Sequence, residues 1–370
     1  MRPSVLLTGA TGAVGSELLR RLAARKETTV NALVRRGSTR QPDVAGILHD
    51  MEAAARVVVF EGELRDGPTL GLAEVDLDAL MRETTHIVHC GGSTSFTLPL
   101  GEARALNVGG TQAVLDFARR CDNLSSVAIF STLYVSGKRS GVFSEDDFGD
   151  AGTGFVNSYE QSKAEVEKLV RNAMHELPVL LLRLGTVAGD SHTGAVRGFN
   201  AIHHAVRLVY NGLAPMIPGD PDECVDIVSS DFVADAALHL IDNGDTGVFH
   251  LASGAESSSS LADLIGATVE SLVRFRPAWR KRAIEKPLIV DLDTYELFVR
   301  SVEEAGNEVM RDAMRSISTF AYQLAYPKLF DTARTRAALK GSGIAPARAL
   351  DFYPRVVKYC LDSNWGTQPC

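Results

Sequence analysis

Tyr159 and Lys163 lie four residues apart at the start of a segment with helical character, which continues through 163–170. On a helix this spacing puts both side chains on one face. A tyrosine hydroxyl can exchange a proton with a carbonyl oxygen, but its ordinary pKa near ~10 makes it a poor base at neutral pH. A nearby ammonium lowers the pKa of the tyrosine, because it stabilises the phenolate. The pair therefore predicts acid–base chemistry at a carbonyl group, whereas a Tyr/Lys pair without further motifs is usually a solvated helix face.

Two hydroxyl residues, Ser131 and Thr132, follow the apolar run 127–130. Ligands of open parallel sheets bind beyond the carboxyl ends of the strands. A hydroxyl at this position can hydrogen-bond a substrate carbonyl oxygen, and either residue is a candidate. The competing interpretation is that these hydroxyls cap the next turn.

A glycine-rich segment follows the apolar run 5–7 and precedes a helical pattern at 17–22. Glycine at three spaced positions permits a tight turn, close approach of the backbone to a pyrophosphate, and close packing of helix on strand. The N-terminus of the helix would then face the phosphates. We predict a dinucleotide-binding turn made by Thr8, Gly9, Thr11, Gly12, Ala13, Val14 and Gly15, although a glycine triplet alone is weak evidence.

The choice of dinucleotide depends on the end of the second predicted strand, where Arg35 and Arg36 stand and no acid follows until Asp43. A carboxylate at this point binds the ribose 2′-hydroxyl of NAD, whereas arginine suits the 2′-phosphate of NADP. The pair therefore favours NADPH. The alternative is that both arginines only decorate a surface turn.

The elements that must position these residues alternate along the chain. Strands are expected at 4–8, 29–34, 56–60, 86–90, 126–131, 179–184 and 247–251, with helices between them and at 230–242. This alternation predicts an α/β fold, a doubly wound parallel (Rossmann) sheet with a smaller, mainly helical substrate region at its C-terminal side. We expect residues 1–190 and 225–254 to form the dinucleotide-binding domain, and 191–224 and 255–370 to form the substrate region.

Composition narrows the class further. The 370 residues are 45% hydrophobic and 23% charged, with a net charge of −8, which argues against nucleic acid as the principal partner. No apolar run is long enough for an integral membrane segment, and the first strand begins too early for a signal peptide. The five cysteines lack paired spacing, so we expect reduced thiols and a cytoplasmic location. The nine histidines show no metal-ligand spacing, and no metal site is expected.

Together these motifs resemble the extended short-chain dehydrogenase/reductase family. Within it, the chain is most similar to fatty acyl reductases and to the thioester reductase domains of carboxylic acid reductases and peptide synthetases. The segments that carry this likeness are 85–96, 106–111, 130–135, 189–194 and 330–336. The likeness covers most of residues 1–255.

The resemblance implies roles for individual residues. It makes Tyr159 the proton donor, Lys163 its pKa partner and ribose anchor, and Thr132 the carbonyl-orienting hydroxyl, with Ser131 as the second candidate. Gly9, Gly12 and Gly15 match the phosphate-binding glycines, and the remaining cofactor contacts are Glu63, Leu64, Cys90, Gly91, Gly92 and Asn107. Some positions depart from the family pattern: Glu63 replaces an aspartate, Gly91 and Gly92 replace two alanines, and Leu184 and Gly185 stand where proline is common.

Two features of the C-terminal region bear on the substrate. Apolar residues recur at helical spacing, namely Phe298, Val302, Val309, Met310, Met314, Ile317, Phe320 and Leu324. They fit either a flexible wall for an acyl chain or, as the favoured interpretation, an ordinary helical core.

Basic residues crowd the segment 274–286, namely Arg274, Arg276, Arg280, Lys281, Arg282 and Lys286. They could attract the phosphates of coenzyme A or an acidic acyl carrier protein, or simply be solvated.

The sequence and its resemblance predict an NADPH-dependent reductase of an acyl thioester, carried by coenzyme A or by an acyl carrier protein. The product would be an aldehyde, with further reduction to the alcohol left open. Alternatives of the same fold are a nucleotide-sugar epimerase or dehydratase, which would hold its NAD tightly, and a general carbonyl reductase. An alternative of another class is a non-catalytic NADP(H)-binding sensor.

Overall fold

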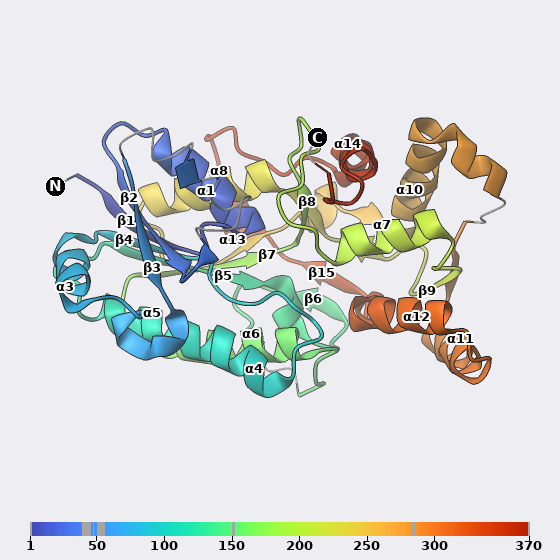
Figure 1. Cartoon of the computed structure of the whole chain (residues 1–370), viewed down its shortest axis with the longest axis horizontal. Coiled ribbons are helices and arrows are strands. Elements are labelled where there is room, and N and C mark those ends of the chain that lie inside the picture. Colours follow the sequence, from blue (N-terminus) through green and yellow to red (C-terminus); the bar gives the residue numbers. More distant parts are fainter. Residues whose placement is uncertain are drawn as a thin grey trace.

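The centre of the molecule is a seven-stranded sheet in which all neighbouring strands run parallel (Figure 1). The computed structural model describes residues 2–38, 46, 48–49, 56–149, 152–282 and 286–368. The strands are β1 (Ser4–Thr8), β2 (Thr29–Arg35), β3 (Val57–Gly62), β4 (His86–His89), β5 (Ser126–Thr132), β7 (Val179–Leu184) and β12 (Gly247–Leu251). Their order is β12-β7-β5-β4-β1-β2-β3, so the direction of winding reverses between β1 and β4.

This sheet confirms the predicted doubly wound parallel fold. The predicted strands all form, and their bounds differ only at some ends; β3, for example, spans Val57–Gly62 where the sequence predicts 56–60. Continuous apolar runs predicted these strands, because a strand that is covered on both faces buries every side chain. Ligands of such sheets bind in the crevice at the winding reversal, beyond the carboxyl ends of the strands.

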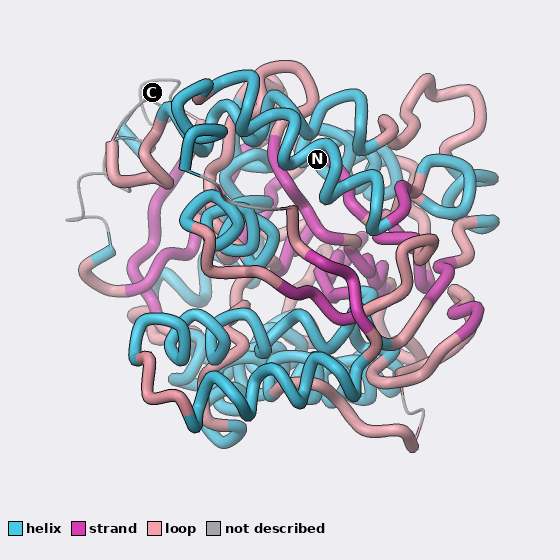
Figure 2. The backbone as a smooth tube through the Cα atoms, turned by 90° about the vertical axis from the view of Figure 1, so that its right-hand side faces the viewer, coloured by secondary structure: helices cyan, strands magenta, loops and turns pink. Residues whose placement is uncertain are grey.

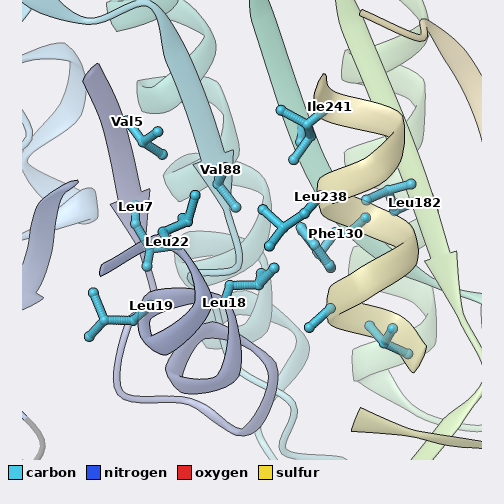
Figure 3. Packing of buried hydrophobic residues seen from close by; sticks show 14 of the residues in the cluster. Val5, Leu7, Leu18, Leu19, Leu22, Val88, Phe130, Leu182, Leu238 and Ile241 are labelled. Carbon is cyan, nitrogen blue, oxygen red and sulfur yellow. The ribbon is translucent and has the colours of Figure 1, made fainter. Parts of the chain in front are cut away.

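Helices cover both faces of the sheet. On the upper face in Figure 1 lie α1 (Ala13–Ala23), α8 (Ser230–Asp242) and α13 (Ala333–Ala338). On the lower face lie α3 (Glu74–Glu83), α5 (Gly110–Ala118) and α6 (Ser158–Ala173), with α4 (Leu100–Arg104) and the π-helical segment Ala105–Gly109 leading into α5. Figure 3 shows the packing on the upper face, where α1 and α8 meet the strands through Leu18, Leu22, Leu238, Val88 and Phe130.

A second cluster of helices forms the right-hand side of Figure 1. It comprises α7 (Ala201–Asn211), α10 (Leu261–Phe275), α11 (Leu292–Glu304), α12 (Glu308–Ala321) and α14 (Ala349–Asp362). Seen from that side, helices lie above and below strands (Figure 2). The shared core contains Trp279, Tyr295, Met314 and Phe352, all buried. The predicted mainly helical C-terminal region is therefore confirmed.

Further short strands pair outside the seven-stranded sheet. They pair as β8 (Thr186–Gly189) with β11 (Ile227–Ser229), β9 (Met216–Pro218) with β14 (Leu288–Val290), β10 (Cys224–Val225) with β13 (Ser259–Ser260), and β6 (Gly141–Phe143) with β15 (Lys328–Phe330). Further short helices are α9 (Gly254–Ser257) and the 3₁₀ segments Leu64–Thr69, Leu133–Ser136, Pro277–Arg282 and Tyr322–Ala325.

Part of the C-terminal region packs against the part of the molecule that contains the central sheet. β15 pairs with β6, and Leu339, just after α13, packs in the same cluster as α1 and α8. A segment from the predicted substrate region therefore lies against the sheet. The predicted domain bounds at residues 190, 225 and 255 stay predictions.

Most residues of the apolar row predicted around α12 form a core stripe. Met314 and Ile317 are buried, and Phe298, Met310 and Phe320 pack against the same cluster. Val309 is 64% exposed, so its assignment to the row is wrong. The reason is helical geometry: Met310, Met314 and Ile317 repeat at the four- and three-residue spacing of one face, and Val309 is one residue out of step.

A buried charge network joins α6 to the sheet. The Arg183 guanidinium on β7 is fully buried and donates to the Glu167 carboxylate on α6, at 2.7 Å between Nη2 and Oε2. It also donates to the Asp147 carbonyl oxygen, at 2.6 Å. Ser131 Oγ donates to Glu167 Oε1, at 2.7 Å. Since arginine stays charged, this carboxylate is needed to compensate it.

We predict that Glu167→Gln lowers the free energy of unfolding by about 3–5 kcal/mol, because removing one partner leaves a buried charge uncompensated. Asp242→Asn is the matched control. Asp242 pairs with Arg25 at 2.8 Å on the surface, where such pairs contribute less than about 1 kcal/mol. Urea unfolding followed by circular dichroism measures both variants. Equal losses would contradict the assigned role of the buried pair.

Candidate active site

The predicted dinucleotide turn lies between β1 and α1, at the winding reversal. Gly9 has φ +72°, and a Cβ there would lie 2.6 Å from the Cys90 carbonyl carbon. A Cβ on Gly15 would lie 2.0 Å from the Gly9 carbonyl oxygen. Both positions thus require glycine, because the backbones of two strand ends and a helix meet there. Gly12 has more room, and its N–H donates to the Gly9 carbonyl oxygen at 2.9 Å, which closes the turn.

The start of α1 is suited to an anion. Gly12 is the N-cap residue in extended conformation, and within the described ranges no side chain caps this helix end. The N–H groups of the first turn therefore face outward with the positive end of the helix dipole. The close glycine turn and this helix end fit the pyrophosphate of a dinucleotide, which Gly9, Gly12, Ala13 and Val14 would hold.

The end of β4 packs against the same turn. A Cβ on Gly91 would lie 2.9 Å from both Leu64 Cδ1 and Thr8 Oγ1, and a Cβ on Gly92 would lie 2.7 Å from Asn107 Oδ1. The two glycines where the family has alanines are therefore explained by close packing. Gly91 N–H also donates to Thr8 Oγ1 at 3.1 Å, which ties the ends of β1 and β4 together.

Asn107 connects the loop after β4 with the helix of the predicted catalytic residues. It is buried in the π-helical segment, and its Oδ1 accepts from the Ser93 N–H at 2.7 Å. Its Nδ2 donates to the Ser93 carbonyl oxygen at 3.1 Å and to Ser162 Oγ on α6 at 2.9 Å. This is a bridging position of the kind that the resemblance implies.

Tyr159 and Thr132 are brought together from α6 and from the end of β5. The ring centroid of Tyr159 lies 5.4 Å from that of Phe96. Burial raises the pKa of Tyr159, and the Thr132 side chain, which lies close to the phenol oxygen, only partly offsets this rise. The phenol is therefore protonated at neutral pH. Thr132 Oγ1 also accepts from the Tyr134 N–H at 3.2 Å, so it caps the following turn as well.

Ser131, the second candidate hydroxyl, points elsewhere. It is as buried as Thr132, but its Oγ donates to Glu167 inside the charge network. The structure thus separates the two neighbours: Thr132 lies beside Tyr159, and Ser131 is hydrogen-bonded to Glu167.

Lys163 lies on the same helix face as Tyr159 and reaches the end of β5. Its Nζ donates to the Phe130 carbonyl oxygen at 2.6 Å. Burial lowers the pKa of Lys163 to about 8, against the attraction of Glu167 and Cys90. The pKa of Tyr159 is shifted by burial and by its interactions with Thr132, Glu160 and Tyr134. The predicted action of Lys163 on Tyr159 therefore stays a prediction.

The residues predicted to select the dinucleotide differ in their contacts. Arg35 is exposed at the end of β2. Arg36 Nη2 donates to the Gly71 carbonyl oxygen at 2.5 Å and lies 3.5 Å from Asp66 Oδ2. Arg36 thus supports the loop that follows Glu63, and Arg35 stays the candidate for the predicted contact to a 2′-phosphate.

Two residues near Tyr159 were missed by sequence reasoning. The Tyr134 hydroxyl is hydrogen-bonded to Thr186 Oγ1 at 2.8 Å, and Glu160 accepts several hydrogen bonds at the start of α6. The signal for Glu160 was present, since Asn157 and Glu160 have the three-residue spacing of a capping box.

The described basic side chains of the segment 274–286 lie in different surroundings. Arg276 pairs with Asp362 at 3.1 Å, and Arg274 and Lys286 line an open cavity of about 540 Å³ beside α10 and α14. None of the predicted catalytic residues lines this cavity. The side chains of Arg280, Lys281 and Arg282 lie outside the described residues.

In the part of the chain that the structure describes, His, Cys, Asp and Glu side chains do not gather in groups of three or more that could hold a metal ion. His89, for example, lies between Thr8 Oγ1 at 2.7 Å and Thr111 Oγ1 at 3.1 Å. Among the same residues, no helix has both the length and the apolar character needed to cross a bilayer.

Comparison with curated proteins gives relatives with longer chains. A linear gramicidin synthase protein of Brevibacillus parabrevis is 29% identical over 280 residues, and glycine betaine reductase of Emericella nidulans is 30% identical over 268. The large subunit of L-2-aminoadipate reductase of Penicillium chrysogenum is 30% identical over 239. These alignments cover 71%, 67% and 58% of this chain but 5%, 21% and 17% of the relatives. The chain therefore corresponds to a small part of each.

Solved structures share the fold. The terminal R domain from the myxalamid PKS-NRPS biosynthetic pathway has a TM-score of 0.78 at 24% identity, covering 100% of this chain and 92% of that one. UDP-glucuronic acid 4-epimerase from Bacillus cereus in complex with NAD has a TM-score of 0.67 at 16% identity, covering 98% and 99%. At these identities the likeness concerns the fold alone.

The family itself follows from a sequence match. The family model described as male sterility protein, an NAD-binding domain, matches residues 7–237, more than half of the chain. This range includes the glycine turn, Thr132, Tyr159 and Lys163. The chain belongs to the male sterility protein family.

Proposed function

We propose that this chain is an NADPH-dependent reductase that converts an acyl thioester into an aldehyde and a free thiol. The observation that carries the proposal is that Thr132, at the carboxyl end of β5, lies close to Tyr159 on α6, at the same edge of the parallel sheet as the glycine turn. Two of the relatives are named reductases, and the fold is that of an R domain. A thioester on a carrier protein is favoured over coenzyme A, because another chain of this fold is a thiolation-reductase di-domain, with a TM-score of 0.73.

The chemistry follows from which groups carry protons. NADPH, when bound, supplies the hydride that adds to the thioester carbonyl carbon. Thr132 and Tyr159 hydrogen-bond the carbonyl oxygen, and Tyr159, kept protonated by burial, gives it a proton as negative charge develops. The resulting thiohemiacetal then breaks its C–S bond: its hydroxyl proton returns to the Tyr159 phenolate as the aldehyde C=O forms, and the sulfur leaves as a thiolate that takes a proton from water. Reduction of the aldehyde to the alcohol would need a second NADPH.

We predict that the protein consumes NADPH with acyl thioesters and releases one thiol per aldehyde formed. Tyr159→Phe should lower turnover by about 10²–10⁴-fold, because it removes the proton donor. The measurement is NADPH absorbance together with thiol titration, on acyl-pantetheine, acyl-coenzyme A and carrier-bound substrates. Turnover of free aldehydes or ketones alone would favour a general carbonyl reductase. NAD retained through purification would favour an epimerase or dehydratase. Wild-type rates in Tyr159→Phe would overturn the assigned proton donor, and NADPH binding without turnover of any substrate would favour the sensor.

We predict that Arg35→Ala weakens NADPH binding by at least about tenfold and leaves NADH binding nearly unchanged, since a charge-assisted hydrogen bond to the 2′-phosphate is lost. Dissociation constants from cofactor fluorescence measure this. Arg120→Ala, an exposed arginine beyond α5, is the matched control. An equal loss for both cofactors would contradict the preference for NADPH.

We predict that turnover falls as pH rises through about 8, the value to which burial lowers the pKa of Lys163. The ammonium is present below that pH and lost above it, whereas burial moves the pKa of Tyr159 in the other direction. The pH profile of kcat at saturating NADPH tests this. The arginine of Lys163→Arg stays charged over this range, so the kcat that this variant retains should not change with pH. A flat wild-type profile from about pH 7 to 10 would contradict the role of Lys163.

A further inference from the structure

The first turn of α6, which carries Tyr159, is held by an unusual set of buried contacts. Asn157 caps the helix: its Oδ1 accepts from the Glu160 N–H at 3.0 Å, and its Nδ2 donates to Glu160 Oε1 at 3.0 Å. The Val156 N–H donates to Glu160 Oε2 at 2.9 Å. Asn157 Nδ2 also donates to the Thr319 carbonyl oxygen on α12, at 2.8 Å. The helix start is therefore bonded to the C-terminal region.

Glu160 has a second, longer connection to that region. Gln323 Nε2 donates to Glu160 Oε2 at 2.6 Å. Gln323 Oε1 in turn accepts from Lys328 Nζ at 2.7 Å, and Lys328 also donates to the Tyr326 carbonyl oxygen at 3.1 Å. Glu160, Gln323 and Lys328 are all buried. A carboxylate, an amide and an ammonium thus form one continuous chain of hydrogen bonds.

The amide in the middle gives this chain a direction. Glutamine has a donor end and an acceptor end, and here the donor meets the carboxylate and the acceptor meets the ammonium. Both contacts are charge-assisted, which makes them stronger than neutral hydrogen bonds. Removing either end would leave a buried polar group without its partner.

Helix formation alone does not need this arrangement. Asn157 already caps α6, and burying a carboxylate and an ammonium costs free energy that hydrogen bonds repay only in good geometry. The groups facing the chain are Tyr134 and Tyr159 near Glu160, and Glu223 near Lys328. Burial raises the pKa of both Glu160 and Glu223 to about 7 and lowers that of Lys328 to about 8. What the arrangement does provide is one fixed position for the residue beside Tyr159.

We propose that Glu160, Gln323 and Lys328 are positioning residues, through which the C-terminal segment 319–328 fixes the Tyr159 hydroxyl relative to Thr132. Tyr159 and Glu160 are adjacent in the first turn, so a shift of one moves the other. A misplacement of about 1 Å can reduce a rate by about 10²-fold. This inference rests on the proposed function, because its kinetic part requires a reaction.

The test uses shape-matched variants of the full chain. Gln323→Met and Lys328→Met remove the hydrogen bonds at similar size, and Lys328→Arg keeps the charge. Gln368→Met and Lys340→Met, at exposed positions, are the matched controls. Hydrogen exchange of the peptide covering 156–163 reports the restraint, and kcat and KM report its consequence. NADPH affinity is measured in each variant.

We expect faster exchange at 156–163 in both Met variants, with kcat lowered about tenfold or more and KM and NADPH affinity within about twofold. Lys328→Arg should recover most of kcat, and the controls should match wild type. Unchanged exchange overturns the chain as a restraint. Faster exchange with unchanged kcat overturns the proposal that these residues position Tyr159, and it shows that they only stabilise the start of α6. If Gln323→Met does not fold, the comparison of Lys328→Met with Lys328→Arg decides.

Failure of the proposed function is recognised separately. If wild type reduces aldehydes but no thioester, the thioester proposal fails, and the same variants are compared with an aldehyde as substrate. If wild type reduces neither, Tyr159 has no reaction to be positioned for, and both proposals fall whatever the exchange data show.

Discussion

The buried guanidinium of Arg183 is the constraint on which the site depends. It cannot lose its proton, so it must be surrounded by acceptors, and Glu167 is the one that carries charge. Glu167 lies four residues after Lys163 and eight after Tyr159, so all three share one face of α6. Fixing Glu167 against β7 therefore also fixes the face that presents Tyr159 and Lys163 to the end of β5. Fold stability and the geometry of the site have the same origin here.

Much of this arrangement could be predicted from the sequence, because its signals are local. Continuous apolar runs mark the buried parallel strands, and the spacing of Gly9, Gly12 and Gly15 marks the turn before α1. What local signals could not decide is the choice between Ser131 and Thr132. Both are buried to a similar degree, so only their partners separate them, and the partner of Ser131 lies 36 residues away on another element.

The contacts that the sequence did not reveal are those between distant segments. Glu160 and Gln323 are 163 residues apart, and no periodicity links the start of a helix to a 3₁₀ turn so far along the chain. The same limit applies to the apolar row of α12. Its spacing identifies a buried face, but only the fold shows that Met314 and Ile317 are used in packing helices together, so they do not form the wall of an acyl channel.

These contacts give α6 two anchors of different kinds. Glu167, in its middle, is bonded to the sheet, and Glu160, at its start, is bonded to the C-terminal region. Lys163 lies between them and reaches the end of β5. The glycine turn belongs to the sheet, whereas segment 319–328 belongs to the C-terminal region in which we expect the acyl group. A helix bonded to both is the element that can align a proton donor with a carbonyl group held from one side and a hydride supplied from the other. Neither anchor alone would set that alignment, because each fixes a different turn of the helix.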